Sequence, residues 1–194
     1  MKRTITIICF LLFLVNSFAQ NNLQTGITIG YNSSTFIGSD KSGLELSSIP
    51  GFYLGGIVNY PINSRFSLLA NVALASRGTE INTISDITED VIFFYLDVPL
   101  ILKMNLLTGK IITPYIVLGG AFDYNILAGS TGGGNLNDVK NIDLGIVSGL
   151  GIDIWKLSFG IRYNYGLIPF DNSDLKLNLR NSTLSFLVGI KFNK

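Results

Sequence analysis

Histidine is absent from this sequence of 194 residues, and cysteine occurs once, as Cys9 in an apolar run near the N-terminus. If that run is removed on export, the remaining chain contains neither residue type. Disulfides, thiolate metal sites and mechanisms that need an imidazole are then excluded. We therefore expect no cofactor and no metal site.

The sequence also lacks a long apolar run after residue 20, although 47% of its residues are hydrophobic. A membrane-spanning helix needs eighteen or more consecutive apolar residues, and no later segment supplies them. The apolar residues alternate instead with Gly, Ser, Asn, Asp and Arg. Since only helices and closed barrels satisfy every backbone group inside lipid, this composition favours a barrel.

The first nineteen residues are typical of a secretory signal peptide. Lys2 and Arg3 precede the apolar run 5–15, and small residues at Ser17 and Ala19 predict cleavage after Ala19. An uncleaved anchor is the alternative, but the run is too short to span a bilayer as a helix. We expect a signal peptide over residues 1–19 and a single barrel domain over residues 20–194.

Acidic and basic residues occur in nearly equal numbers. Removal of the signal peptide leaves 12 basic and 13 acidic residues, a net charge of −1. This balance gives no electrostatic reason to expect a nucleic-acid partner.

A two-residue rhythm runs through most of the chain and is clearest at residues 93–103. Leu96, Val98, Leu100 and Leu102 occupy one face of an expected strand, whereas Tyr95, Asp97, Pro99 and Lys103 occupy the other. Similar alternation predicts strands at about 23–36, 51–60, 66–80, 93–103, 111–125, 142–154, 157–167 and 182–192. We predict an all-β fold, an eight-stranded antiparallel up-and-down transmembrane β-barrel.

The expected connections alternate in length. The long ones are 37–50, 81–91, 126–141 and 168–181, and the short ones are 61–65, 106–110 and 153–156. Outer-membrane barrels have short periplasmic turns and longer external loops, so this pattern predicts a periplasmic N-terminus. The glycine run 132–134 is interpreted as a loop tip, because it lacks the Lys and Ser/Thr of a phosphate-binding loop.

Four acids and four bases fall on the expected inward faces. They are Arg77, Asp97, Lys103, Asp123, Asp143, Asp153, Arg162 and Lys191. Eight strands leave an interior that side chains fill, and isolated buried charges are costly, so these groups should pair as a polar plug. Strand direction predicts one cluster around Arg77 and another around Asp153; transport through the interior is the alternative.

Two further expectations concern single residue types. The aromatic residues near strand ends should form two girdles at the membrane interfaces; they are Tyr60, Phe66, Tyr124, Trp155, Tyr163, Tyr165 and Phe192. Pro99 cannot donate a ladder hydrogen bond, so it should mark a bulge, which we favour, or a locally unpaired position. Opening of an interior pocket beside Tyr95 and Asp97 is the functional alternative.

The segment Tyr95-Leu96-Asp97-Val98-Pro99-Leu100-Ile101-Leu102-Lys103 resembles the Y-L-E-I-P-L-L-L-K strand of the PorT-like outer-membrane β-barrel proteins, with Asp97 in place of Glu. The resemblance implies an eight-stranded barrel of the loosely defined "porin family" in the outer membrane of a Gram-negative cell. It supplies no catalytic residues to transfer. Some members of the family are tied to a protein secretion system.

Three functions remain open at this point. The first is a non-enzymatic, monomeric envelope scaffold or protein-interaction module, with outer-membrane lipid and envelope or secretion-system proteins as candidate partners. The second is a narrow channel for small solutes or ions. The third is a soluble periplasmic lipocalin-like binder, disfavoured because glycines share the charged face. Catalysis has one candidate pair, Asp123 with Asp143, and we do not favour it.

Overall fold

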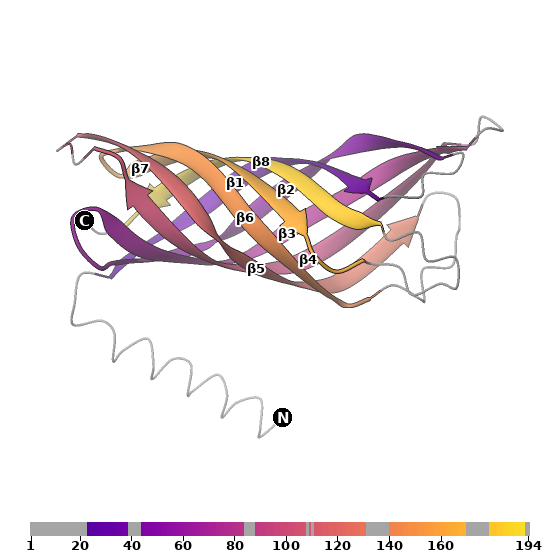
Figure 1. Cartoon of the computed structure of the whole chain (residues 1–194), viewed down its shortest axis with the longest axis horizontal. Coiled ribbons are helices and arrows are strands. Elements are labelled where there is room, and N and C mark those ends of the chain that lie inside the picture. Colours follow the sequence, from indigo (N-terminus) through magenta and orange to yellow (C-terminus); the bar gives the residue numbers. More distant parts are fainter. Residues whose placement is uncertain are drawn as a thin grey trace, which may run out of the picture.

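The computed structural model describes residues 23–38, 44–83, 88–107, 109, 111–130, 140–169 and 179–192. Within them, eight strands form a closed sheet in which sequence neighbours pair antiparallel and the last strand pairs with the first (Figure 1). They are β1 Gln24–Ile37, β2 Leu44–Pro61, β3 Phe66–Thr83, β4 Thr88–Asn105, β5 Ile112–Ser130, β6 Ile142–Ile154, β7 Leu157–Gly166 and β8 Arg180–Lys191. The predicted eight-stranded barrel is confirmed, whereas the predicted signal peptide lies outside the described residues.

No helix in the described part of the chain is long and apolar enough to cross a bilayer.

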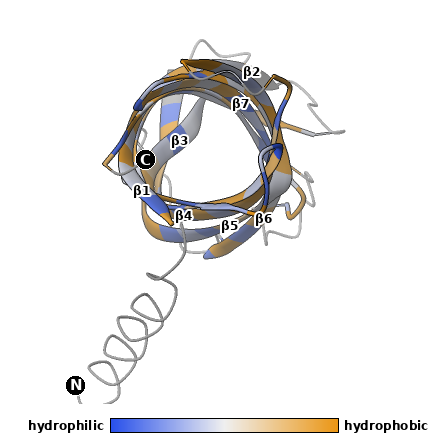
Figure 2. Cartoon of the chain, turned by 90° about the vertical axis from the view of Figure 1, so that its left-hand side faces the viewer, coloured by the Kyte–Doolittle hydropathy of each residue, from blue (hydrophilic) through white to orange (hydrophobic). Residues whose placement is uncertain are grey.

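The two-residue rhythm gives the barrel an apolar outer surface and a mixed interior. In β6, Leu144, Ile146 and Leu150 are exposed, whereas Asp143 and Val147 are buried. Figure 2, a view along the barrel, shows hydrophobic and hydrophilic residues alternating along the strands. This arrangement suits a barrel whose outer band meets hydrocarbon, and it is the reverse of what a lipocalin-like binder requires.

The two ends of the barrel differ. At the turn end, short connections at 62–65, 106–111 and 155–156 join the strands, and β1 begins beside the end of β8 (Figure 1). The amide of Phe192 donates to the Thr25 carbonyl at 2.7 Å, and that of Trp155 donates to Ile111 at 2.9 Å. We call the opposite end, where β1 ends and β2 begins, the loop end.

Several strands are longer than the sequence predicts, so parts of the expected long connections are strand. β2 begins at Leu44 instead of residue 51, and β5 ends at Ser130 instead of residue 125. Leu44 pairs with Thr83, and Thr88 pairs with Asn82. These contacts extend the β2–β3 and β3–β4 pairs toward the loop end. A backbone ladder needs no apolar partner outside lipid, so the apolar alternation underestimates these strands. The glycine run 132–134 lies outside the described residues.

Pro99 does not sit at a bulge, which corrects the favoured prediction. It pairs with Ala121 of β5, and the β3–β4 register is the same on both sides of it. The pairing with β3 is nevertheless interrupted between Leu100 and Asp97, so the missing amide proton of Pro99 falls on the β3 side. This geometry fits the alternative prediction, in which Pro99 is a locally unpaired position of the strand.

The bulges lie elsewhere. The β4–β5 register shifts between Phe94 and Tyr95, where Ile126 is the extra residue of β5. Ile126 and Leu127 are consequently both exposed. The β2–β3 register shifts between Ser48 and Tyr53, and there the Ser76 hydroxyl accepts the Phe52 amide at 2.9 Å.

The aromatic residues expected in girdles lie toward both ends of the outer surface. Those exposed are Tyr60, Tyr124, Trp155, Tyr163 and Phe192. Phe66 and Tyr165 are partly buried. The distribution matches the amphipathic belts that flank the apolar band of outer-membrane barrels.

A charge placed on the outer band tests this assignment. Leu118, on β5, is 62% exposed, and Leu118→Arg should lower the free energy of unfolding by about 2–4 kcal/mol in lipid vesicles, because arginine at the membrane midplane is costly. Ile111→Arg, at the turn end and 68% exposed, is the matched control and should cost about 0–1 kcal/mol. Equal effects of the two substitutions in urea titrations would contradict the assignment.

Candidate functional site in the barrel interior

Arg77 is the centre of a buried ion cluster near the loop end, which we call the arginine cluster. Its Nη2 lies 2.7 Å from Asp97 Oδ2, on the adjacent β4, and its Nη1 lies 2.6 Å from Asp123 Oδ2, on β5. All three residues are at most 4% exposed. The Arg77 guanidinium also lies 5.4 Å from the centre of the Tyr95 ring. Such charge-assisted contacts between buried groups fix all three side chains.

Asp143 adjoins the arginine cluster without an ion pair. It lies opposite Asp123 in the β5–β6 ladder and is 7% exposed. The backbone amides of Leu144 and Ile168 donate to its carboxylate. Its Oδ1 has no hydrogen-bond partner among the described residues. With every group ionised, one guanidinium would therefore face three carboxylates.

A second cluster, the lysine cluster, lies toward the turn end. Lys103 Nζ of β4 and Lys191 Nζ of β8 each lie 2.5 Å from Asp153 Oδ2 of β6. Lys103 Nζ also lies 3.8 Å from the centre of the Tyr115 ring, close enough for a cation–π interaction. One carboxylate thus serves two ammonium groups, and the cluster carries one excess positive charge.

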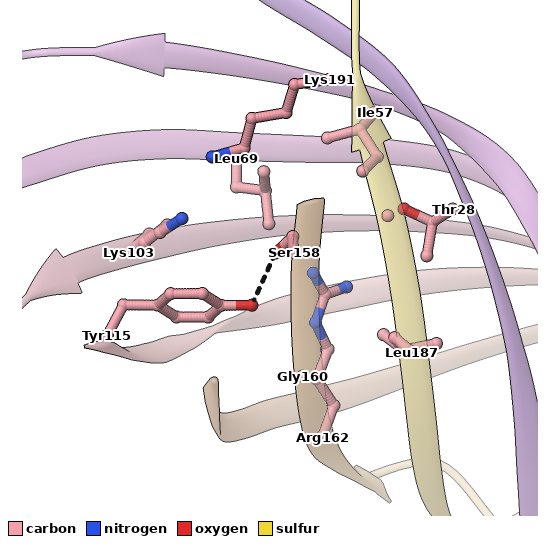
Figure 3. Close-up of a pocket in the computed structure, with 11 residues that line it drawn as sticks. Thr28, Ile57, Leu69, Lys103, Tyr115, Ser158, Gly160, Arg162, Leu187 and Lys191 are labelled. Carbon is pink, nitrogen blue, oxygen red and sulfur yellow. Dashed lines mark hydrogen bonds between the residues drawn. The ribbon is translucent and has the colours of Figure 1, made fainter. Parts of the chain in front are cut away.

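Arg162, on β7, has a different environment from the other three bases. It is partly buried and forms no ion pair or hydrogen bond with any described residue. Its guanidinium lies between Thr28 and the hydrogen-bonded pair of Tyr115 and Ser158 (Figure 3). The expectation that all eight charges pair therefore does not hold for Arg162 and Asp143.

Uncharged side chains, for which the sequence predicts no specific role, fill much of the remaining interior. Near the loop end, Phe36 and Phe93 pack with Tyr95, and nearer the turn end Ile101 packs with Tyr115. The same alternation that places Asp97 inward also places Phe93 and Ile101 inward, so the signal was present. The interior is therefore a sequence of ionic and apolar layers.

Glycine and asparagine accommodate this packing. A Cβ at Gly151 would lie 2.4 Å from the Tyr115 hydroxyl, so only glycine leaves room for that ring. Asn32 is fully buried, accepts from Ser185 at 2.8 Å and donates to the carbonyls of Phe52 and Ser76. These bonds connect β1 with β8, β2 and β3 across the interior.

The described residues offer little to catalytic or metal chemistry. They contain no group of three or more Asp, Glu, His or Cys arranged to hold a metal ion. In the candidate pair, Asp123 is held by Arg77, and the carboxylate of Asp143 accepts backbone amides. The geometry is suited to holding charges in place.

An apolar outer band, a charged interior and a closed antiparallel sheet of eight strands define the class of small outer-membrane barrels. The sequence pattern of the family described as "Outer membrane protein beta-barrel domain" matches residues 18–172. The chain belongs to this family, whose members reside in the outer membrane of Gram-negative cells.

Solved structures of the same architecture show low sequence identity to the chain. OprG from Pseudomonas aeruginosa is 14% identical, with a TM-score of 0.54 and coverage of 89% of this chain and 95% of OprG. Neisserial surface protein A is 17% identical, with a TM-score of 0.53 and coverage of 89% and 100%. The outer membrane enzyme PagL is 16% identical, with a TM-score of 0.44 and coverage of 82% and 98%. No curated protein matches the chain significantly.

Proposed function

We propose that this protein is a non-enzymatic, monomeric outer-membrane barrel that acts as an envelope scaffold or protein-interaction module through its external loops. The observation that supports the proposal is the layered interior, in which the arginine cluster, the lysine cluster and the apolar layers occupy the inside of the barrel. A closed interior leaves the ends of the barrel as the surfaces available for a partner.

The orientation in the membrane follows from the two unequal ends. In outer-membrane barrels the short turns, the start of the first strand and the end of the last strand lie on the periplasmic side, so the loop end of this barrel faces outward. The likeness of residues 95–103 to PorT-like barrels of the porin family supports envelope or secretion-system proteins as partners. Absence of histidine, together with the engagement of Asp123 by Arg77, supports a role without catalysis.

A partner at the loop end can be tested by photo-crosslinking in living cells. A photoreactive residue at Leu127, near the loop end, should give a protein adduct of defined size. The same residue at Leu118, which is equally exposed but lies in the outer band, should react with lipid only. Lipid adducts alone at both positions would contradict the interaction role.

A narrow channel is the second candidate, supported by the polar vestibule at the turn end. This open space of about 270 Å³ is lined by polar side chains such as Asn59 and Asn105, and it leads to Lys103, Asp153 and Lys191. Passage beyond it would require the lysine cluster to separate.

Conductance distinguishes the two candidates. Purified protein inserted in a planar bilayer should give no steady current, because bound ion pairs and apolar layers fill an eight-stranded interior. A gel shift between unheated and boiled samples serves as the control that the inserted protein is folded. Steady currents from folded protein would favour the channel.

A further inference from the structure

The cavity beside Arg162 is the one place in the described interior where a cation faces space without a counter-charge in contact. Its lining includes Thr28, Lys103, Tyr115, Arg162 and Lys191, with Ser158 completing the polar wall (Figure 3). No carboxylate contributes to that wall. The lining therefore presents three cations, of which two share Asp153 and the third, Arg162, has no described partner.

Thr28 supplies an independent observation that points to a ligand. Its side chain is 3% exposed, and its hydroxyl has no hydrogen-bond partner among the described residues. A buried hydroxyl without a partner is costly, and most such groups bind water or an ion. The hydroxyl lines the same cavity as the Arg162 guanidinium, so one bound species can satisfy both groups.

The distribution of interior charge fixes the sign of that species. The loop-end group of Arg77, Asp97, Asp123 and Asp143 has two more acids than bases. The group around the cavity, Lys103, Arg162, Lys191 and Asp153, has two more bases than acids. An anion at the cavity would reduce this excess, whereas a cation would increase it.

The size of the cavity restricts the anion. Its volume of about 20 Å³ accommodates one water-sized particle. Gly160 and Gly189 keep this space open: a Cβ at Gly189 would lie 3.4 Å from Thr28 Oγ1, and one at Gly160 would lie 3.1 Å from the Tyr115 hydroxyl. A monatomic halide fits such a space, whereas sulfate, phosphate or a carboxylic acid does not.

We propose that the barrel holds one chloride-sized anion in this cavity, bound by the Arg162 guanidinium and the Thr28 hydroxyl in the positive field of Lys103 and Lys191. The turn-end vestibule shares both lysines with the cavity, so the anion would enter from this side when the lysine cluster separates. One bound halide reduces the excess positive charge of the turn-end half of the interior from two to one. The site does not depend on the scaffold role proposed above.

Chloride NMR of the full barrel in detergent tests the site. Exchange of ³⁵Cl⁻ with folded protein should broaden its resonance, and added bromide should reverse the broadening. Arg162→Gln, which keeps polar atoms but removes the charge, should weaken chloride binding about tenfold or more, because hydrogen bonds to a charged group are the stronger kind.

Gly189→Ala tests the same site without changing any charge. Its methyl group should reduce binding by filling the cavity. Gly56→Ala, at an exposed glycine where an added Cβ would lie 4.0 Å from the Gly26 carbonyl oxygen, should leave binding unchanged. The proposal is overturned if folded wild-type protein does not broaden the resonance, if Arg162→Gln and Gly189→Ala both bind as wild type does, or if sulfate competes as well as bromide.

Discussion

Arg77→Ala should lower the free energy of unfolding by about 3–5 kcal/mol, because it removes the base that contacts two buried carboxylates. The penalty comes mainly from Asp97 and Asp123, which would remain buried without a cation. Urea titration in lipid vesicles, followed by the gel shift between folded and unfolded barrel, measures the loss.

Two companion variants separate the ion cluster from a general effect of removing arginine. Arg65→Ala, at an exposed turn residue, should change stability by less than about 0.5 kcal/mol. Adding Asp97→Asn and Asp123→Asn to Arg77→Ala should restore much of the loss, because neutral amides need no cation. If Arg77→Ala matches Arg65→Ala, the arginine cluster does not hold the barrel together.

Asp153→Ala should have an effect of similar size, about 3 kcal/mol or more, because it leaves two neighbouring ammonium groups without their shared carboxylate. The same urea titration measures it. Lys191→Met should cost much less, since it leaves the Lys103 and Asp153 pair balanced. Combining Asp153→Ala with Lys103→Met should recover part of the loss, and a purely additive double variant would show that the contacts carry little coupling.

The alternation of apolar and polar residues correctly predicts the fold and which face of each strand points outward, for a physical reason. A strand in a small membrane barrel has lipid on one side and a crowded interior on the other, so side chains such as Leu100 and Asp97 differ sharply in polarity. The same contrast disappears beyond the membrane, which is why the alternation predicts a loop over residues 44–50, where the structure has the first part of β2.

The partners of the interior charges could not be predicted from alternation. Arg77 reaches Asp123 two strands away, and Lys191 on β8 reaches Asp153 on β6. Such contacts depend on strand tilt and on the stagger of the closed sheet, which side-chain polarity does not specify. For the same reason, strand direction predicted two clusters but could not show that Arg162 and Asp143 lack ion-pair partners.

Pro99 illustrates a second limit on what the sequence alone can predict. Its missing amide proton predicts a disturbance in β4, but the sequence does not show which neighbouring strand bears it. The structure places the interruption toward β3 and keeps the register intact. The bulge at Ile126 has no proline beside it, whereas the β2–β3 register shift between Ser48 and Tyr53 contains Pro50, so a proline marks one of the two irregularities.

Which face of the sheet meets hydrocarbon is the point on which every proposed role depends, and a spin-label scan along β6 tests it most directly. Single nitroxide labels at cysteines replacing residues 142–150 would be compared for collisions with oxygen, which concentrates in lipid, and with a water-soluble nickel complex. We predict a two-residue period, with high oxygen collision rates at Ile142, Leu144, Ile146 and Leu150 and low rates at Asp143 and Val147. High rates at Asp143 and Val147, or no period of two, would contradict the assignment.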